Sequence, residues 1–273
     1  MPPVTGGKVV VFGAGGPVGA AAARALAPQY TLRLTDVRSI EQIAAAGKPQ
    51  SPGAPLPEVR PAPHECRVVD VADYDQVLDA CRGMDAIVNV TVVRPHLAAA
   101  FHVNLIGAYN IARAAVHCGI RRIVHTGPYH TWLDHNADYW WDFRVPDEVP
   151  LHPGGDLYAV SKFLGGEVTR VFAEHHGLEV ITFLYCNFMP DDGGERLDGS
   201  RVGPFTTSWE DCGDAFLNGL RAPAPPNPYE VFFICSQLPH GKISPAKAKR
   251  LLGWEPKSTF ERLWRRGEAE API

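Results

Sequence analysis

The order of hydrophobic and polar positions along the chain predicts strands that alternate with helices. Repeated strand-then-helix units favour a parallel sheet with right-handed crossovers. The strands are apolar on both faces, so helices are expected to cover both sides of the sheet. The predicted fold class is therefore α/β, with a doubly wound parallel sheet. The expected strands are residues 8–12, 31–35, 66–70, 85–93, 121–126 and 179–185, and the expected helices are 17–27, 39–46, 73–82, 96–118 and 156–175.

Two segments interrupt this alternation. Residues 47–63 are rich in proline and glycine, which predicts a mobile surface loop. Residues 127–155 are rich in aromatic side chains and lie between a strand end and a helix. They fit either a lid that stacks on a sugar or a small core beneath a loop.

Composition narrows the class of protein. Hydrophobic residues make up 45% of the 273 positions, enough for one large α/β domain with a modest added lobe. The 26 Lys and Arg against 30 Asp and Glu give a net charge of −4 without a basic block, so neither nucleic acid nor a membrane surface is an expected partner. The six cysteines form no CxxC pair, which indicates a reduced, cytoplasmic protein. The first strand begins at residue 8, so no cleaved signal peptide is expected, and no apolar stretch is long enough to span a bilayer.

A glycine-rich turn joins the first strand to the first helix. The run GAGGPVG over residues 13–19 places Gly13, Gly16 and Gly19 at three-residue spacing, with Pro17 and Val18 at the helix start. Glycine permits the tight turn and lets backbone N–H groups approach a pyrophosphate at the helix N-terminus. The sequence therefore predicts a dinucleotide site on a Rossmann-type sheet.

Asp36 ends the second strand, 17 residues after Gly19. Its carboxylate can accept hydrogen bonds from the adenosine ribose hydroxyls, and it would repel a 2′-phosphate. Arg38 offers the opposite preference but lies two residues further on, so NAD is the expected cofactor and NADP is less favoured.

Tyr158 and Lys162 lie four residues apart in the run YAVSK, on one face of a predicted helix. An ammonium beside a phenol favours the phenolate and lowers the tyrosine pKa. The tyrosine can then exchange a proton with a substrate hydroxyl while hydride moves to or from the nicotinamide. We expect residues 1–182 to form the NAD-binding domain that carries this pair, and residues 183–273 to be mainly a small C-terminal substrate-binding lobe, partly interleaved with the sheet.

These motifs together resemble the extended short-chain dehydrogenase/reductase superfamily, the NAD-dependent epimerase/dehydratase group. Asp70 and Val71 are similar to the pair that contacts adenine there, and the resemblance also places Val90 and Thr91 in the cofactor pocket. The run NLIG at 104–107 and the run SPAKAKRLLGWEP at 244–256 match further family segments. The run RIVHTGPYHT at 122–131 looks most like uronate dehydrogenases, which oxidise a sugar acid at its anomeric carbon to a lactone with NAD.

The chain departs from the family pattern in the substrate region. Pro128 aligns with the usual serine after the fifth strand and has no side-chain donor. Thr126, His130 and Thr131 are the candidates to replace it, with His130 and Thr131 weighed equally. The arginine usual after the sixth strand is absent from the run LYCN over 184–187.

Further substrate contacts are expected from Asn187 and Arg196, and Arg201 lies in the same segment. A guanidinium suits a carboxylate, although a solvated loop charge explains each arginine equally well. The sequence has His130, Asp134 and His135 close together, but their spacing favours polar loop residues over a metal site, so no metal is expected.

The leading hypothesis is an NAD-dependent oxidoreductase acting on a sugar or sugar-acid hydroxyl, with Tyr158 as acid/base, Lys162 as pKa modulator and ribose anchor, and Thr131 or His130 as polariser. The alternatives are a nucleotide-sugar epimerase or dehydratase and a non-catalytic cofactor sensor. The resemblance also implies a homodimer through helices 96–118 and 156–175. Apolar residues at helical spacing there are Val103, Ile106, Ile111, Ala115, Phe163, Val168, Val171 and Phe172.

Overall fold

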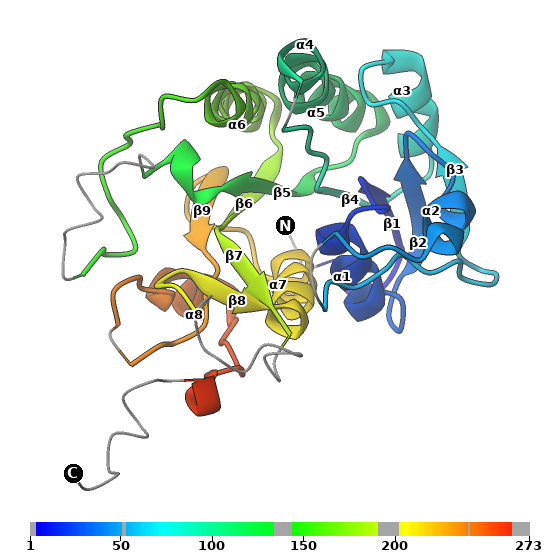
Figure 1. Cartoon of the computed structure of the whole chain (residues 1–273). Helices are drawn as coiled ribbons and strands as arrows, with labels where there is room; N and C mark the ends of the chain where they lie inside the picture. Colours follow the sequence, from blue (N-terminus) through cyan, green and yellow to red (C-terminus); the bar gives the residue numbers. More distant parts are fainter. Residues whose placement is uncertain are drawn as a thin grey trace, which may run out of the picture.

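A computed structural model describes residues 4–50, 53–94, 96–133, 144–190, 202–239 and 241–263. Seven strands form one sheet in the order β3-β2-β1-β4-β5-β6-β9, and every neighbouring pair is parallel (Figure 1). The predicted doubly wound α/β fold is confirmed. The strands are β1 (Lys8–Phe12), β2 (Thr31–Asp36), β3 (Glu65–Val68), β4 (Ala86–Asn89), β5 (Arg122–Pro128), β6 (Glu179–Tyr185) and β9 (Tyr229–Phe233).

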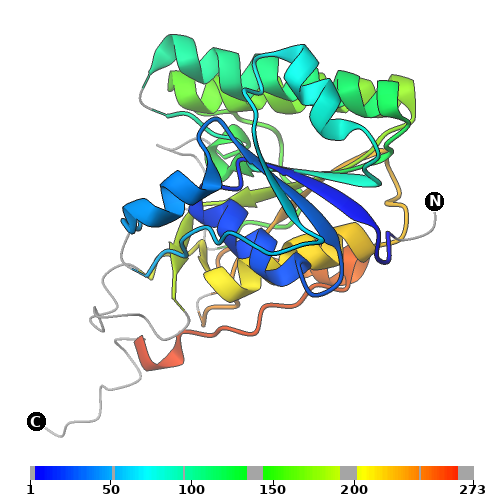
Figure 2. The same cartoon turned by 90° about the vertical axis from the view of Figure 1, so that its right-hand side faces the viewer.

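Helices cover both faces of the sheet, as Figure 2 shows from the side. Alternate residues of β1 point to opposite faces, so Val9 and Val11 pack against one helical layer while Val10 and Phe12 pack against the other. The first layer contains α1 (Pro17–Leu26) and α7 (Trp209–Arg221), and the second contains α3 (Tyr74–Cys81), α5 (Gly107–Cys118) and α6 (Leu157–His176).

The predicted helix 96–118 is interrupted. It consists of α4 (Leu97–Ala100), a π-helical turn η1 (Phe101–Ile106) and then α5. The buried Asn104 lies in the middle of η1, where its amide bonds both backbone groups of Val93 and the hydroxyl of Ser161. These contacts tie the turn to the end of the β4 segment and to α6, and a local irregularity of this kind is common at functional sites.

The predicted strand 85–93 is shorter than expected and ends at Asn89. The side chain of Asn89 accepts hydrogen bonds from the backbone N–H and the hydroxyl of Thr91, which turns the chain out of the sheet. Residues 90–93 thereby become cavity walls instead of strand.

Several elements in the C-terminal part were not anticipated. Both α7 and β9 belong to the layers of the main sheet, whereas β7 (Asn187–Met189) and β8 (Thr206–Ser208) form a separate parallel pair. The division of the chain into an NAD-binding domain over residues 1–182 and a substrate-binding lobe over residues 183–273 stays a prediction. The remaining elements are α2 (Ile40–Ala46), η2 (Tyr129–Thr131), α8 (Ala246–Leu252) and η3 (Glu261–Leu263).

The proline-rich loop contains no helix or strand over its described residues 47–50 and 53–63. A salt bridge of 3.0 Å between Arg24 and Glu58 connects it to α1. Across the described parts of the chain, no helix has both the length and the apolar character needed to cross a membrane.

Candidate active site

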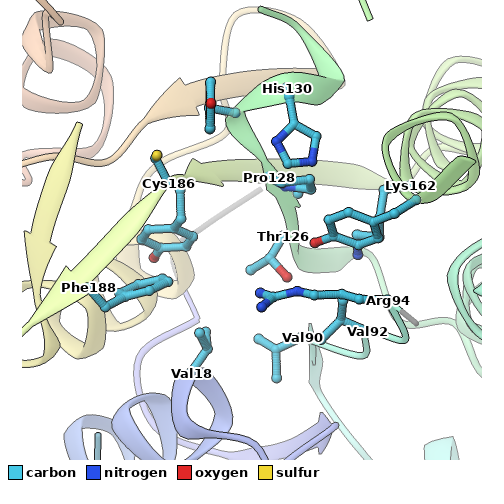
Figure 3. A pocket seen from close by; sticks show the side chains of 14 residues that line it. Val18, Val90, Val92, Arg94, Thr126, Pro128, His130, Lys162, Cys186 and Phe188 are labelled. Atoms are coloured by element: carbon cyan, nitrogen blue, oxygen red, sulfur yellow. The ribbon is translucent and has the colours of Figure 1, made fainter. Parts of the chain in front are cut away.

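The carboxyl ends of β4, β5 and β6 and the start of α1 surround a cavity of about 400 Å³ (Figure 3). Parallel sheets of this topology bind ligands at that edge. The walls are apolar near α1 and β4 and more polar toward η2 and α6. The lining residues are Val18, Val90, Val92, Arg94, Thr126, Gly127, Pro128, Tyr129, His130, Tyr158, Lys162, Tyr185, Cys186 and Phe188.

The glycine turn has the geometry that a dinucleotide requires. Gly13 has a φ of +88°, and a Cβ there would lie 2.9 Å from the backbone N of Thr91. A Cβ on Gly19 would overlap the carbonyl oxygen of Gly13. In contrast, a Cβ on Gly16 would have its nearest neighbour at 3.6 Å. Helix α1 begins at Pro17 without a side-chain cap, so its first N–H groups can bind an anion.

A second cavity of about 270 Å³ lies on the other side of the turn. Its walls include Asp36, Asp70, Val71 and Thr91, and it shares Val92 with the first cavity. One oxygen of Asp36 accepts the Gly15 N–H at 3.1 Å, which holds the carboxylate beside the turn. The two cavities with the glycine turn between them therefore fit an extended dinucleotide, with the adenine end on the Asp36 side.

Tyr158 and Lys162 both face the first cavity from α6. The helix starts at a cap in which Asp156 accepts the N–H of Ala159 at 2.8 Å, and this cap fixes the first turn that carries Tyr158. The ammonium of Lys162 is buried and donates to the carbonyl of Thr91 at 3.2 Å. The four-residue spacing thus brings the phenol and the ammonium to one wall, as the sequence predicted.

The charges of the pair are set by burial and by a further cation. Burial raises the pKa of the Tyr158 phenol, and the guanidinium of Arg94, 5.6 Å from the ring centroid, opposes that rise. Burial, and to a smaller extent the charge of Arg94, lower the pKa of Lys162 to about 7. Arg94 is therefore a further cation that acts on the phenol, beside Lys162, whose predicted effect on the Tyr158 pKa stays a prediction.

A buried polar network supports this wall from behind. The amide of Asn89 bonds the ring of His125 at 3.1 Å, and the hydroxyl of Thr126 donates to the Asn89 carbonyl. Burial holds the pKa of His125 well below its usual range, and the nearby Lys162 adds to this effect. Asn89 also bonds Thr91, whose carbonyl accepts from Lys162, so the network fixes the acceptor that orients the ammonium.

The end of β5 decides between the two candidate polarisers. Pro128 lines the cavity and contributes no donor there. Thr131 is buried outside the cavity lining, and its hydroxyl donates to the Pro128 carbonyl at 2.8 Å. His130 lines the cavity with its ring centroid 5.4 Å from that of Tyr158. The geometry favours His130 over Thr131 as a group that can meet substrate.

A model of the NAD dependent epimerase/dehydratase family matches residues 9–202. The chain belongs to this family. Its NAD-binding Rossmann fold is therefore shared, which agrees with the glycine turn and the paired cavities described above.

Family members with assigned activities are similar over most of the chain. The L-arabinose 1-dehydrogenase (NAD(P)(+)) of Haloferax volcanii is 26% identical over 70% of this chain and 81% of its own length. The NAD-dependent glucose-6-phosphate dehydrogenase of the same organism is 25% identical over 95% of this chain and 97% of its own length. The crystal structure of uronate dehydrogenase from Agrobacterium tumefaciens superposes with a TM-score of 0.70, with 26% identity, 98% coverage of this chain and 90% of that chain.

Within this family fold, Asn187, one of the two substrate residues expected after β6, lies outside the cavity lining. The amide of Asn187 contacts the hydroxyl of Thr206, and Asn187 does not line the cavity, whereas its neighbours Cys186 and Phe188 do. Arg196 and Arg201 lie outside the described residues. So do Asp134 and His135, and the described residues contain no group of three potential metal ligands.

The structure adds Arg94 to the site, a residue that the sequence reasoning missed. The available signal was its position, since it follows the predicted strand 85–93 directly and loops after parallel strands form the ligand edge. Sequence reasoning also missed Tyr185, Cys186 and Phe188 as cavity residues, because they continue the apolar pattern of β6 and β7 and resemble core positions. Cys186 is exposed on this wall, and desolvation by its neighbours raises the pKa of its thiol to about 11.

Proposed function

We propose that the chain is an NAD-dependent dehydrogenase that oxidises a hydroxyl of a sugar or sugar acid. The observation that carries the proposal is the position of Tyr158 and Lys162 on one wall of a cavity that also reaches Val18 at the start of α1, directly after the glycine turn. The relatives named above, an arabinose, a glucose-6-phosphate and a uronate dehydrogenase, support a sugar as the substrate class.

The reaction divides into a proton transfer and a hydride transfer. Tyr158 as phenolate removes the proton of the substrate hydroxyl, while the C–H hydrogen of the same carbon leaves as hydride and a carbonyl forms. Bound NAD supplies the hydride acceptor. Lys162, held by the Thr91 carbonyl, lies on the same wall to hold the nicotinamide ribose. His130 is the proposed donor to the reacting oxygen in place of the missing serine.

The preference for NAD over NADP rests on Asp36. Its carboxylate lines the adenine-side cavity, where a 2′-phosphate would meet a like charge. Asp36→Asn should therefore reduce the preference for NAD, because NAD binds more weakly and NADP binds better. The measurement is the ratio of kcat/KM for NAD to kcat/KM for NADP. An unchanged ratio would remove Asp36 from this role.

The decisive experiment is NADH formation from NAD with uronic acids, sugar phosphates, neutral aldoses and simple secondary alcohols. Tyr158→Phe is the control, because it keeps the ring and removes the acid/base. NADH that appears with one sugar class and is lost in Tyr158→Phe supports the proposal. NAD binding without NADH from any of them would contradict it, and would favour an epimerase, a dehydratase or a cofactor sensor.

A further inference from the structure

The cavity is unbalanced in charge. The described residues that line it include two cations, Arg94 and Lys162, and no carboxylate. Lys162 is buried, and its ammonium already bonds the Thr91 carbonyl. Arg94 is exposed, and its guanidinium points into the cavity (Figure 3), 5.6 Å from the centroid of the Tyr158 ring. The cavity therefore holds one exposed guanidinium that a ligand in it can contact.

Arg94 contacts an aromatic ring, whereas most of the described arginines contact a carboxylate. Arg33, Arg122 and Arg170 each form an ion pair with a glutamate. Within the described parts of the chain, no carboxylate forms an ion pair with Arg94, and its ring contact is with Tyr158. A guanidinium has five donors in a fixed plane that match a carboxylate or phosphate, and Tyr158 uses few of them.

The backbone before Arg94 is fixed although its side chain is exposed. Asn104 accepts the N–H of Val93 at 3.1 Å and donates to the Val93 carbonyl at 2.9 Å. The same amide donates to the hydroxyl of Ser161 on α6 at 2.9 Å. The starting point of the arginine side chain is thus held at a constant place relative to the helix that carries Tyr158 and Lys162.

We propose that Arg94 binds the anionic group of the substrate, a carboxylate or a phosphate on the sugar, and selects anionic over neutral sugars. This inference rests on the proposed dehydrogenase function. The end of β6 supplies no arginine for that purpose, because its last residues are Leu184 and Tyr185 followed by Cys186. An anion at Arg94 also offsets the like charges of Arg94 and Lys162 in one cavity.

The test compares Arg94→Gln and Arg94→Lys with the wild type on galacturonate, glucose 6-phosphate and glucose. Arg113→Gln is the matched control, because Arg113 also lies over a tyrosine ring, that of Tyr74, but outside this cavity. Loss of charge-assisted hydrogen bonds should raise KM for the anionic sugar about 10- to 100-fold in Arg94→Gln, with a smaller change in kcat. Arg94→Lys should recover part of the loss, and Arg113→Gln should behave as wild type. The anion that the wild type prefers identifies carboxylate or phosphate.

Three results would overturn the assignment: a wild type that prefers glucose, an unchanged KM in Arg94→Gln, or the same KM increase produced by Arg196→Gln alone. If no sugar is oxidised, the dehydrogenase proposal fails separately. Calorimetric binding of galacturonate and glucose 6-phosphate to the enzyme with NADH then decides the role of Arg94. Binding that Arg94→Gln weakens at least 10-fold supports it, whereas absent or equal binding refutes it.

Discussion

At the scale of single residues, the charge of Arg94 acts on the proton that the proposed reaction moves. Its guanidinium opposes the rise in the Tyr158 pKa caused by burial, whereas Asp156 adds to that rise. Among the described residues, Lys162 and His130 also line the cavity, with the His130 ring 5.4 Å from that of Tyr158. Because Lys162 has its own pKa lowered to about 7, its charge falls as the pH rises through neutrality, and Arg94 remains the permanent cation.

Arg94→Gln should therefore move the acid limb of the pH profile to higher pH. Removal of the cation raises the Tyr158 pKa, so the phenolate needed for hydroxyl oxidation forms only at higher pH. The measurement is kcat/KM for oxidation across pH 5–10. Arg94→Lys keeps the charge and should leave the limb near its original position. A limb that stays in place in Arg94→Gln would mean that Arg94 does not tune the phenol.

The glycines of the turn separate a requirement of the fold from a requirement of the ligand. Gly19→Ala places a methyl group against the backbone of Gly13 and should destabilise the protein by about 1–3 kcal/mol. Gly16→Ala has room for the methyl group and should cost about 1 kcal/mol or less, as an N-cap change. Both substitutions should weaken the binding of NAD, because the pyrophosphate approaches this turn. Thermal unfolding and NAD titration measure the two effects, and equal destabilisation by both variants would contradict this division.

Sequence reasoning at this scale succeeded where covalent spacing decides the geometry. Tyr158 and Lys162 line the same cavity because a helix places residues four apart on one face. It could not rank His130 against Thr131, because the short η2 turn decides which side chain faces the cavity. It missed Arg94 because a long side chain after a strand can point in many directions. Here the two hydrogen bonds of Asn104 to the backbone of Val93 fix the position of the main chain before Arg94.

At the scale of elements, α6 is held against η1 by a close approach of backbones. A Cβ on Gly165 would overlap the carbonyl of Asn104, whereas a Cβ on the adjacent Gly166 would meet only the Tyr229 hydroxyl, at 3.1 Å. Since α6 carries Tyr158 and Lys162, the distance between these two elements sets the position of the catalytic wall.

Gly165→Ala should therefore reduce both stability and turnover. The added methyl group pushes α6 from η1, at a cost of about 1–3 kcal/mol, and displaces the pair on α6. Gly166→Ala is the matched control. Alanine stabilises the helix by about 1 kcal/mol relative to glycine, and the Tyr229 hydroxyl can move aside for the added methyl group. Chemical denaturation and kcat are the measurements. Loss of turnover in Gly166→Ala equal to that in Gly165→Ala would show that the backbone contact with η1 is not the cause.

The elements that sequence reasoning found have long, regular patterns, and those it missed are short or follow a loop. The strand β9 has only five residues. Helix α7 follows a stretch of sequence without regular hydrophobic periodicity, although Ser208 accepts the N–H of Asp211 as a normal helix cap. The break at η1 was not predictable, because it depends on Asn104 reaching Val93 and Ser161, which are distant in sequence.

At the scale of the whole molecule, one face presents apolar side chains to solvent. Ile106 and Val116 on the η1–α5 segment and Leu157 and Val171 on α6 are each more than a third exposed, and Tyr109 lies among them. Ile111 and Ala115, expected on this face, are instead buried in the core. The outer sides of these two helices remain the surface that a second copy of the chain would cover, as the family resemblance implies.

We expect the wild type to sediment as a dimer at micromolar concentration, because two such faces brought together remove apolar surface from water on both chains. Val171→Glu should shift the protein to monomer, since a carboxylate buried in the contact without a partner is costly. Val68→Glu on β3 is the matched control, because Val68 is also exposed but lies near the opposite edge of the sheet. Analytical ultracentrifugation of the three proteins measures the outcome.

A wild type that is monomeric would exclude the dimer. A Val171→Glu variant that remains dimeric while Val68→Glu dissociates would place the interface elsewhere. Because Val171 is exposed in the single chain, the substitution should leave thermal unfolding of the monomer unchanged, which separates loss of assembly from loss of fold.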